Sequence, residues 1–191
     1  ITTDRPARVR ILDGIRVIAQ RMCHGSATIT IPDAKLWNAE QPHLYTLELR
    51  CAGEIIRRRF GLRTVGVSAQ RELLINGAPV KLRGVNHHDT TPDGGWVITP
   101  EQIRNDLLLM KRLNINTIRT SHYPPVPYLT ELADELGFYV VLENDMEAHG
   151  FIQRNPNVPY HYDNHAPDWP GNVPQWEQEH LERMRRTLER F

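Results

Sequence analysis

Three short polar clusters, each placed after a strand-like apolar run, carry the residue types in this chain that could do chemistry. Glu147 and His149 follow the apolar residues 138–142, and residues two apart point to the same side wherever the backbone stays extended. The other two clusters are Asn-His-His-Asp at residues 86–89 and Arg-Thr-Ser-His-Tyr-Pro at residues 119–124. Polar residues at the carboxyl ends of several strands are what the active site of a (β/α) barrel needs.

Each cluster has a chemical and a structural interpretation, and the local sequence leaves both open. Glu147 and His149 could bind a divalent cation, since hard cations prefer carboxylate oxygens and tolerate an imidazole, or they could form a surface pair. His87, His88 and His122 could hydrogen-bond the hydroxyl groups of a sugar, because a neutral imidazole both donates and accepts, or they could pack or cap. Arg119 could hold a carboxylate through two parallel hydrogen bonds or form an ordinary ion pair.

Composition places the chain among globular proteins and argues against two classes of partner. The 191 residues are 40% hydrophobic and 24% charged, and 23 basic residues balance 23 acidic ones. This balance argues against nucleic acid or an anionic membrane as a partner, and no apolar run is long enough to span a membrane. Cys23 and Cys51 have no metal-site spacing, so we expect a reducing, cytoplasmic location. The sequence does not begin with Met, and we expect a fragment or a domain of a longer protein.

The first third of the chain has the pattern of short antiparallel strands. Residues 9–12 and 15–18 flank Asp13-Gly14, a hairpin-type dipeptide, and residues 27–31, 45–51 and 55–60 give further strand-like runs. Strands at this spacing without a helix favour an antiparallel β-sandwich, and we expect Trp37 in its core. We assign residues 1–67 to the carboxyl-terminal part of an immunoglobulin-like sandwich domain.

Residues 68–191 have the alternating pattern of strands and helices. A hairpin is expected around Asn76-Gly77, and its second arm leads into a strand at residues 84–86. Thr99 and Pro100 can begin a helix that ends near Asn114, and a second amphipathic helix at residues 128–136 is stopped by Gly137. Strands at residues 115–119 and 138–142 and a third helix at residues 175–190 complete the pattern. Successive βαβ units require a parallel sheet, the first part of an incomplete (β/α)8 TIM barrel.

Several segments resemble consecutive signatures of the β-galactosidases of glycoside hydrolase family 2. They are Arg-Gly-Val-Asn-His-His at residues 83–88, Ile-Arg-Thr-Ser-His-Tyr-Pro at residues 118–124 and Glu-Ala-His-Gly at residues 147–150. The stretch from Met110 to Asn116 is also similar, as are residues 35–38, 41–45 and 60–63, which resemble the family's sandwich domain and its exit. The segments occur in the family's order over nearly the whole chain.

The resemblance implies roles for individual residues. Glu147 and His149 match the ligands of Mg²⁺, and a monovalent cation is implied as a second ion with ligands outside this chain. Substrate-binding residues are implied at Asn86, His88 and His122, whereas Arg119 matches an arginine that supports the nucleophile.

Trp169 and Trp176 lie beside polar loops, where an exposed indole can stack on a sugar. The family has an acidic residue where this chain has Leu142.

The resemblance also implies a retaining hydrolysis of terminal β-D-galactosides such as lactose, by two carboxylates about 5 Å apart. In the family both carboxylates come from later barrel strands, so we expect the isolated chain to be inactive and to need the remainder of the barrel, on the same or another chain. We expect the full-length protein to be a homo-oligomer. Alternatives are a complementing subunit, a non-catalytic carbohydrate-binding fragment, or another family 2 glycosidase such as a β-glucuronidase. The Glu-x-His-Gly segment favours a galactosidase.

Overall fold

The computed structural model describes residues 1–145 and 169–191, and the chain divides into two compact units. The first unit comprises Ile1–Arg83, Leu107–Asn116 and Glu131–Tyr139. The second comprises Gly84–Asp106, Thr117–Thr130 and Val140–Phe191.

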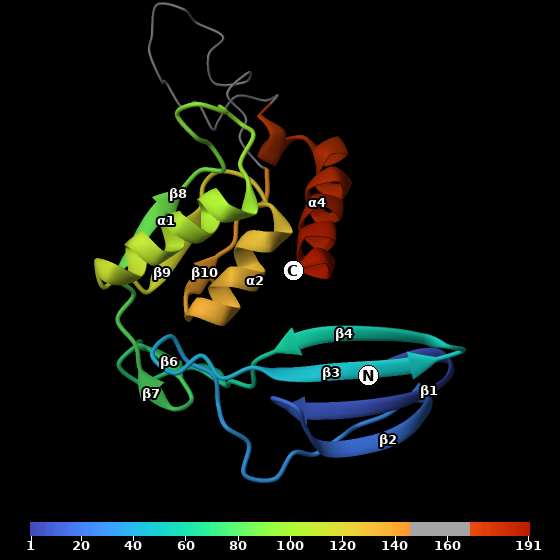
Figure 1. Cartoon of the computed structure of the whole chain (residues 1–191). Coiled ribbons are helices and arrows are strands. Elements are labelled where there is room, and N and C mark those ends of the chain that lie inside the picture. Colours follow the sequence, from blue (N-terminus) through green and yellow to red (C-terminus); the bar gives the residue numbers. More distant parts are fainter. Residues whose placement is uncertain (146–168) are drawn as a thin grey trace, which may run out of the picture. The chain divides into compact units, whose positions relative to one another are not determined.

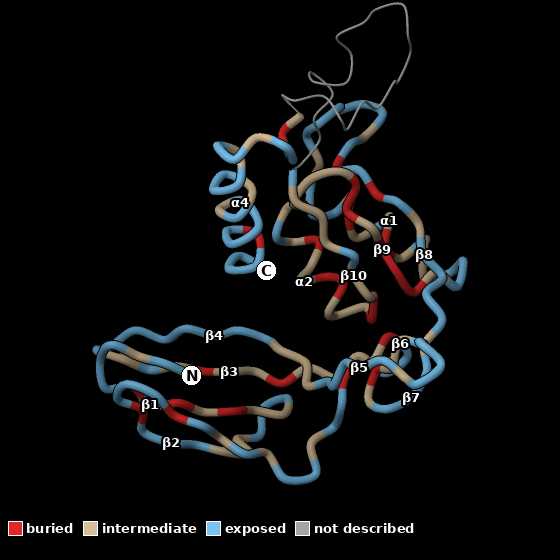
Figure 2. The backbone as a smooth tube through the Cα atoms, turned by 180° about the vertical axis from the view of Figure 1, so that it is seen from behind, coloured by how far each residue is buried: buried red, intermediate tan, exposed pale blue. Residues whose placement is uncertain are grey.

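The first unit begins with a four-stranded antiparallel sheet of strand order β2-β1-β3-β4 (Figure 1). Its strands are β1 (Thr2–Asp13), β2 (Arg16–Ser26), β3 (Tyr45–Cys51) and β4 (Glu54–Phe60). Buried positions lie along β1 and β3 (Figure 2), and Val9, Cys23 and Ala27 form a buried cluster on which Ile29, Leu47 and Leu49 pack. The antiparallel sheet expected in the first third of the chain is therefore confirmed.

The predicted hairpin between the first two strands is confirmed, with its turn one residue later than expected, whereas the strand predicted at residues 27–31 is absent. Residues 27–31 form no strand, and Ala27 and Ile29 instead pack their side chains against the sheet. The β1–β2 turn is formed by Gly14 and Ile15, since Asp13 still pairs with Arg16. Gly14 has a φ of 59°, a backbone conformation that suits glycine at the first position of a two-residue hairpin loop.

The sheet carries one buried carboxylate, Glu48, at the centre of β3. Its register partners are Arg10 on β1 and Arg57 on β4, and Arg50 lies two residues further along β3. All three guanidinium groups lie 2.7–2.9 Å from its carboxylate oxygens. Hydrogen bonds from Arg50 and Arg57 lower the pKa of Glu48 to about 2, although its burial acts in the opposite direction. A charge can be buried here because arginines surround it.

A small antiparallel sheet of order β5-β6-β7 follows, made of β5 (Val65–Val67), β6 (Leu73–Ile75) and β7 (Ala78–Pro79). The predicted hairpin around Asn76-Gly77 is confirmed, with φ angles of 53° and 78° at its two central residues. Asn76 also donates from Nδ2 to the carbonyl of Trp37 at 3.0 Å.

The parallel part of the chain is a three-stranded sheet of order β10-β9-β8. Its strands are β8 (Gly84–His87), β9 (Thr117–Thr120) and β10 (Tyr139–Val141), with helix α1 (Pro100–Arg112) before β9 and helix α2 (Pro127–Leu136) before β10. The buried side chains Ile103 and Leu107 of α1 and Leu129 and Leu132 of α2 recur at helical spacing. The expected βαβ units are confirmed.

The predicted helix ends are also confirmed. The Thr99 hydroxyl accepts the Gln102 amide proton at 3.3 Å and the Gln102 side chain accepts the Thr99 amide proton at 2.9 Å, which is a capping box. Asn114 and Gly137 have φ angles of 61° and 80°, the left-handed conformation that ends helices.

Trp37 lies in a different place from the one predicted. Its indole is buried and donates from Nε1 to the carbonyl of Asp134 in α2 at 2.8 Å. The ring of Tyr139 meets it edge-on at 5.7 Å, and the guanidinium of Arg63 lies 5.3 Å from its centroid. Trp37 therefore packs within the first unit against the end of α2 and the start of β10, and not in the core of a sandwich.

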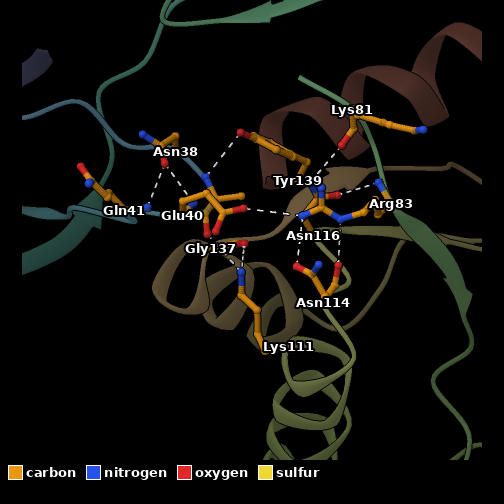
Figure 3. Close-up of polar contacts among 11 residues, drawn as sticks. Asn38, Glu40, Gln41, Lys81, Arg83, Lys111, Asn114, Asn116, Gly137 and Tyr139 are labelled. Atoms are coloured by element: carbon orange, nitrogen blue, oxygen red, sulfur yellow. Dashed lines mark hydrogen bonds and ion pairs between the residues drawn. The ribbon is translucent and has the colours of Figure 1, made fainter. Parts of the chain in front are cut away.

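A polar cluster gathers near the amino-terminal ends of the three parallel strands (Figure 3). The amine of the half-buried Lys111 donates to the carbonyls of Ala39 and Gly137 at 3.1 and 2.6 Å, and burial lowers its pKa. The Asn116 side chain accepts the Arg83 amide proton at 2.7 Å and donates to the carbonyl of Lys81 at 3.0 Å. These bonds fix the segments that lead into β8, β9 and β10.

Helix α4 (Glu177–Arg190) follows two 3-10 turns, η1 (Pro170–Asn172) and η2 (Pro174–Trp176). The predicted third helix is thus confirmed, and Arg183 ties it to Asp145 by a 2.9 Å ion pair. Its apolar residues Leu181, Met184 and Leu188 are exposed. Within the described residues, no helix is long and apolar enough to cross a membrane.

Candidate active site

The parallel pairing of β8 with β9 places Asn86 directly opposite Arg119. Successive strand residues point to opposite faces, so these two side chains share one face of the sheet, while His87 and Thr120 take the other face and are buried. Arg119 donates from Nη1 to Oδ1 of Asn86 at 3.2 Å. The structure therefore brings together two of the polar residues that the sequence placed at strand ends.

The guanidinium of Arg119 is the centre of a polar network in the second unit. Its Nε donates to Oε1 of Glu143, and its Nη2 lies 3.2 Å from Nδ1 of His122. The planar fork of arginine can serve three partners in one plane, which a lysine ammonium cannot reproduce. The interpretation of Arg119 as an ion-paired residue and its interpretation as a site residue are thus compatible.

Glu143 is the member of this network that the sequence interpretation missed. It lies two residues beyond β10, and its amide donates to the Thr120 hydroxyl at 3.0 Å, which holds it beside the end of β9. Its Oε2 lies 3.2 Å from Nδ1 of His122. The sequence does indicate Glu143, because it is the first charged residue after β10. Arg119 is likewise the charged residue at the end of β9.

His122 has two competing partners for one ring nitrogen. Nδ1 can accept a hydrogen bond from Arg119 or donate one to Glu143, but a neutral imidazole nitrogen cannot do both at once. The balance between these neighbours sets the tautomer, and with it whether Nε2 accepts or donates. The Ser121–His122 peptide bond is cis.

His88 is exposed and belongs to the same group of rings. Its centroid lies 5.7 Å from that of His122 and 5.9 Å from that of Tyr123. Tyr123 Oη accepts the Asp89 amide proton at 2.9 Å, so its own proton is available for Nδ1 of His88 at 3.4 Å. Burial raises the pKa of Tyr123, which keeps the phenol protonated. When Nδ1 of His88 accepts this proton, its Nε2–H is a donor for a ligand oxygen.

Asp89 and His87, the chain neighbours of the exposed His88, are both buried. Asp89 is buried, and its Oδ2 accepts the Val126 amide proton at 2.8 Å, which joins the segment after β8 to the segment after β9. His87 lies between Asp89 and Asp106, with ring nitrogens 3.6 and 3.5 Å from their carboxylates. His87 is therefore a structural residue, whereas its neighbour His88 faces solvent.

The predicted metal ligands Glu147 and His149 lie outside the described residues. Within residues 1–145 and 169–191, no group of three or more His, Cys, Asp or Glu side chains is placed to hold a metal ion. A carboxylate and an imidazole fit a divalent cation by donor type, and a hard cation needs further oxygen ligands or water.

The two tryptophans named from the sequence lie near α4, and Trp176 stacks on His180 with centroids 6.3 Å apart.

The arrangement at the strand ends can bind a polyhydroxylated ligand. An amide, two imidazoles, a carboxylate and a guanidinium offer fixed donors and acceptors at spacings of about 3 Å, and aromatic rings stand beside them. Polar groups of this kind next to aromatic surface are what recognition of a sugar requires.

Comparison with known proteins accounts for almost the whole chain. Residues 6–63 match the family described as glycosyl hydrolases family 2, and residues 65–191 match its TIM barrel domain. A β-galactosidase of Arthrobacter sp. (strain B7) is 44% identical over 167 residues, which is 86% of this chain and 15% of that protein. A β-galactosidase large subunit of Latilactobacillus sakei is 36% identical over 163 residues, covering 81% of this chain and 25% of that protein.

Among solved structures, the chain is similar to a β-glucuronidase of Faecalibacterium prausnitzii, with a TM-score of 0.69 and 32% identity. The similarity covers 74% of this chain and 24% of that one. The chain thus spans about 15–25% of the length of these relatives.

Proposed function

The chain belongs to glycosyl hydrolases family 2, and from this membership we propose that the complete protein hydrolyses terminal β-D-galactosides. The observation that carries the proposal is 44% identity to a β-galactosidase over 86% of the chain. That similarity includes a segment whose polar side chains converge at the carboxyl ends of β8, β9 and β10.

In this proposal the strand ends hold the terminal sugar. Asn86, His88 and His122 hydrogen-bond its hydroxyl groups. Arg119 supports the nucleophile, because its guanidinium fixes the Glu143 carboxylate and the His122 imidazole. Glu143 joins this set as a positioning residue, because it contacts both Arg119 and His122. Fixed donors and acceptors contribute most when they match the transition state and do not have to reorganise during the reaction.

The two carboxylates of a retaining glycosidase would come from parts of the protein outside this chain of 191 residues. The remainder of the barrel lies on the same polypeptide, or on a second one as in a two-subunit enzyme. The similarity to a β-galactosidase large subunit supports the arrangement on two polypeptides. We further propose a homo-oligomeric complete protein in a reducing compartment, where the free thiols of Cys23 and Cys51 persist.

Mg²⁺ is the cofactor we propose, with Glu147 and His149 among its ligands. When bound, the cation would supply positive charge near the reacting carboxyl group. With few protein ligands it would keep several waters and bind weakly. A monovalent cation would have its ligands outside this chain.

His122→Ala in the complete protein tests the proposal. Wild type should hydrolyse a nitrophenyl β-D-galactoside, and the variant should lose roughly tenfold to a hundredfold in kcat/KM, the value of one or two well-placed hydrogen bonds. Its melting temperature should stay close to that of wild type, since His122 is half-buried at a strand end. Wild-type kinetics in the variant would remove His122 from the site.

A β-glucuronidase is the second candidate, because a solved β-glucuronidase of Bifidobacterium dentium shares the fold at 34% identity. The nitrophenyl β-D-glucuronide distinguishes the two functions, since its carboxylate needs a cationic partner that a galactoside does not need. Preferential hydrolysis of the glucuronide by the complete protein would replace the first proposal with this one.

A further inference from the structure

Trp96 presents an exposed indole beside the candidate active site and has no role in the function proposed above. It lies between β8 and α1 and is 72% exposed, so most of its ring surface meets solvent. Its centroid lies 6.4 Å from that of His88 and 5.7 Å from that of Tyr123, with interplanar angles of 85° and 61°. The indole therefore extends the ring cluster of His122, His88 and Tyr123 by one exposed ring.

The main chain, and not the indole, holds this segment in place. Thr91 and Gly95 exchange backbone hydrogen bonds of 2.8 and 3.0 Å, and the Thr91 hydroxyl accepts the Gly94 amide proton at 2.9 Å. The amide of Val97 donates to the carbonyl of Gly94 at 3.2 Å. A tight turn with its own hydrogen bonds does not need the Trp96 ring for stability, so that ring is available for another purpose.

Removing the apolar surface of an indole from water is favourable, so a ligand that covers the exposed Trp96 ring would gain binding free energy. The C–H face of a pyranose is the apolar surface that a flat aromatic ring can cover. Its hydroxyl groups meanwhile reach neighbouring polar groups or water. Trp96 is further from the Arg119 network than His88 is, because the ring contacts lead from His122 through His88 to Trp96. A ring in this position would meet the part of a substrate that extends past the sugar held by the two histidines.

We propose that Trp96 is a specificity-determining residue that stacks on the second sugar of a disaccharide substrate. The substrate class is then β-galactosides whose leaving group is itself a hexopyranose. This inference rests on the proposed function, because the placement of the second sugar assumes that His88 and His122 hold the first.

The test compares two substrates in the complete protein, wild type and Trp96→Ala. Lactose carries a second pyranose, whereas methyl β-D-galactoside carries only a methyl group. Loss of one stacking contact should lower kcat/KM for lactose by about tenfold and leave the value for methyl β-D-galactoside within about twofold. Trp96→Phe keeps a ring and should fall between wild type and Trp96→Ala. Val97→Ala is the matched control, since Val97 is next in the chain, equally exposed at 72% and has no ring.

The outcomes separate the two claims. Hydrolysis of neither substrate by wild type would reject the proposed function, and this inference with it. An active wild type whose Trp96→Ala variant loses the same factor on both substrates, or on neither, would overturn the role of Trp96 alone. Should Trp96→Ala lower the melting temperature, the lactose-to-methyl-galactoside ratio of the folded Trp96→Phe variant decides, and an unchanged ratio contradicts the inference.

Discussion

Glu143 joins Arg119 and His122 through the two oxygens of one carboxylate. Oε1 accepts a hydrogen bond from Arg119 Nε, and Oε2 lies 3.2 Å from His122 Nδ1. The guanidinium and the imidazole are also 3.2 Å apart, so the three side chains form a closed triangle. Each member of the triangle is therefore oriented in part by the other two.

Glu143→Gln tests this triangle in the complete protein. The amide keeps the shape of the side chain but removes the charge that holds Arg119 and selects the tautomer of His122. We expect kcat/KM for a nitrophenyl β-D-galactoside to fall by roughly tenfold or more, as charge-assisted hydrogen bonds are worth about 1.5–3 kcal/mol. Asp145→Asn is the matched control, because Asp145 is two residues away and pairs with Arg183. Equal losses in the two variants would show that Glu143 has no special role.

Gly137→Ala should destabilise the protein more than Gly53→Ala. Both glycines have positive φ, 80° and 86°, so both substitutions carry a similar backbone penalty. A Cβ at Gly137 would lie 2.3 Å from the carbonyl oxygen of Ala39, whereas a Cβ at Gly53 meets nothing within 4 Å. The difference in melting temperature between the two variants therefore measures the clash, and equal melting temperatures would contradict the packing around Lys111 and Gly137.

Glu48 should make the stability of the antiparallel sheet depend on acid pH. Its folded pKa is about 2, below the ordinary value of 4.5. The stabilisation is complete above the ordinary value and is lost as pH falls through 4.5 towards about 2. Wild type and Glu48→Gln should therefore differ most in unfolding midpoint near neutral pH. This difference should shrink as pH falls from 4.5 towards about 2. A difference that stays constant from pH 6 to pH 2 would rule out this contribution from Glu48.

Glu147→Gln should greatly weaken the Mg²⁺ dependence that we expect of the complete protein. An amide oxygen has no negative charge to hold a hard cation, so the variant's activity should respond weakly to added Mg²⁺. The measurement is a Mg²⁺ titration of EDTA-treated wild type and variant, followed by galactoside hydrolysis. Superimposable activation curves would exclude Glu147 as a ligand.

Local sequence patterns predicted most of the elements because those elements depend on local chemistry. Helix α1 begins at Thr99 and Pro100, α2 is followed by Gly137, and the hairpin at Asn76-Gly77 needs positive φ at both residues. Residues 27–31 were predicted as a strand because they alternate, but alternation also occurs when Ala27 and Ile29 pack against a sheet. Strand partners are long-range contacts that a local pattern does not contain.

The candidate site was predicted in part for the same reason. Strand ends located Asn86, Arg119, His88 and His122, and the structure brings them together. Glu143 was missed because the acidic residue was expected at position 142, one residue before it. Trp37 was assigned to the wrong core, since nothing near it in the sequence indicates that its indole bonds to Asp134, 97 residues away.

A crystal structure of the complete protein with galactose bound tests the central claim most directly. We expect galactose hydroxyl oxygens within hydrogen-bonding distance, about 2.6–3.2 Å, of His122 and of His88 or Asn86. Arg119 and Glu143 should remain paired beneath the sugar. Galactose bound elsewhere on the protein, with these strand-end residues contacting no sugar hydroxyl, would contradict it.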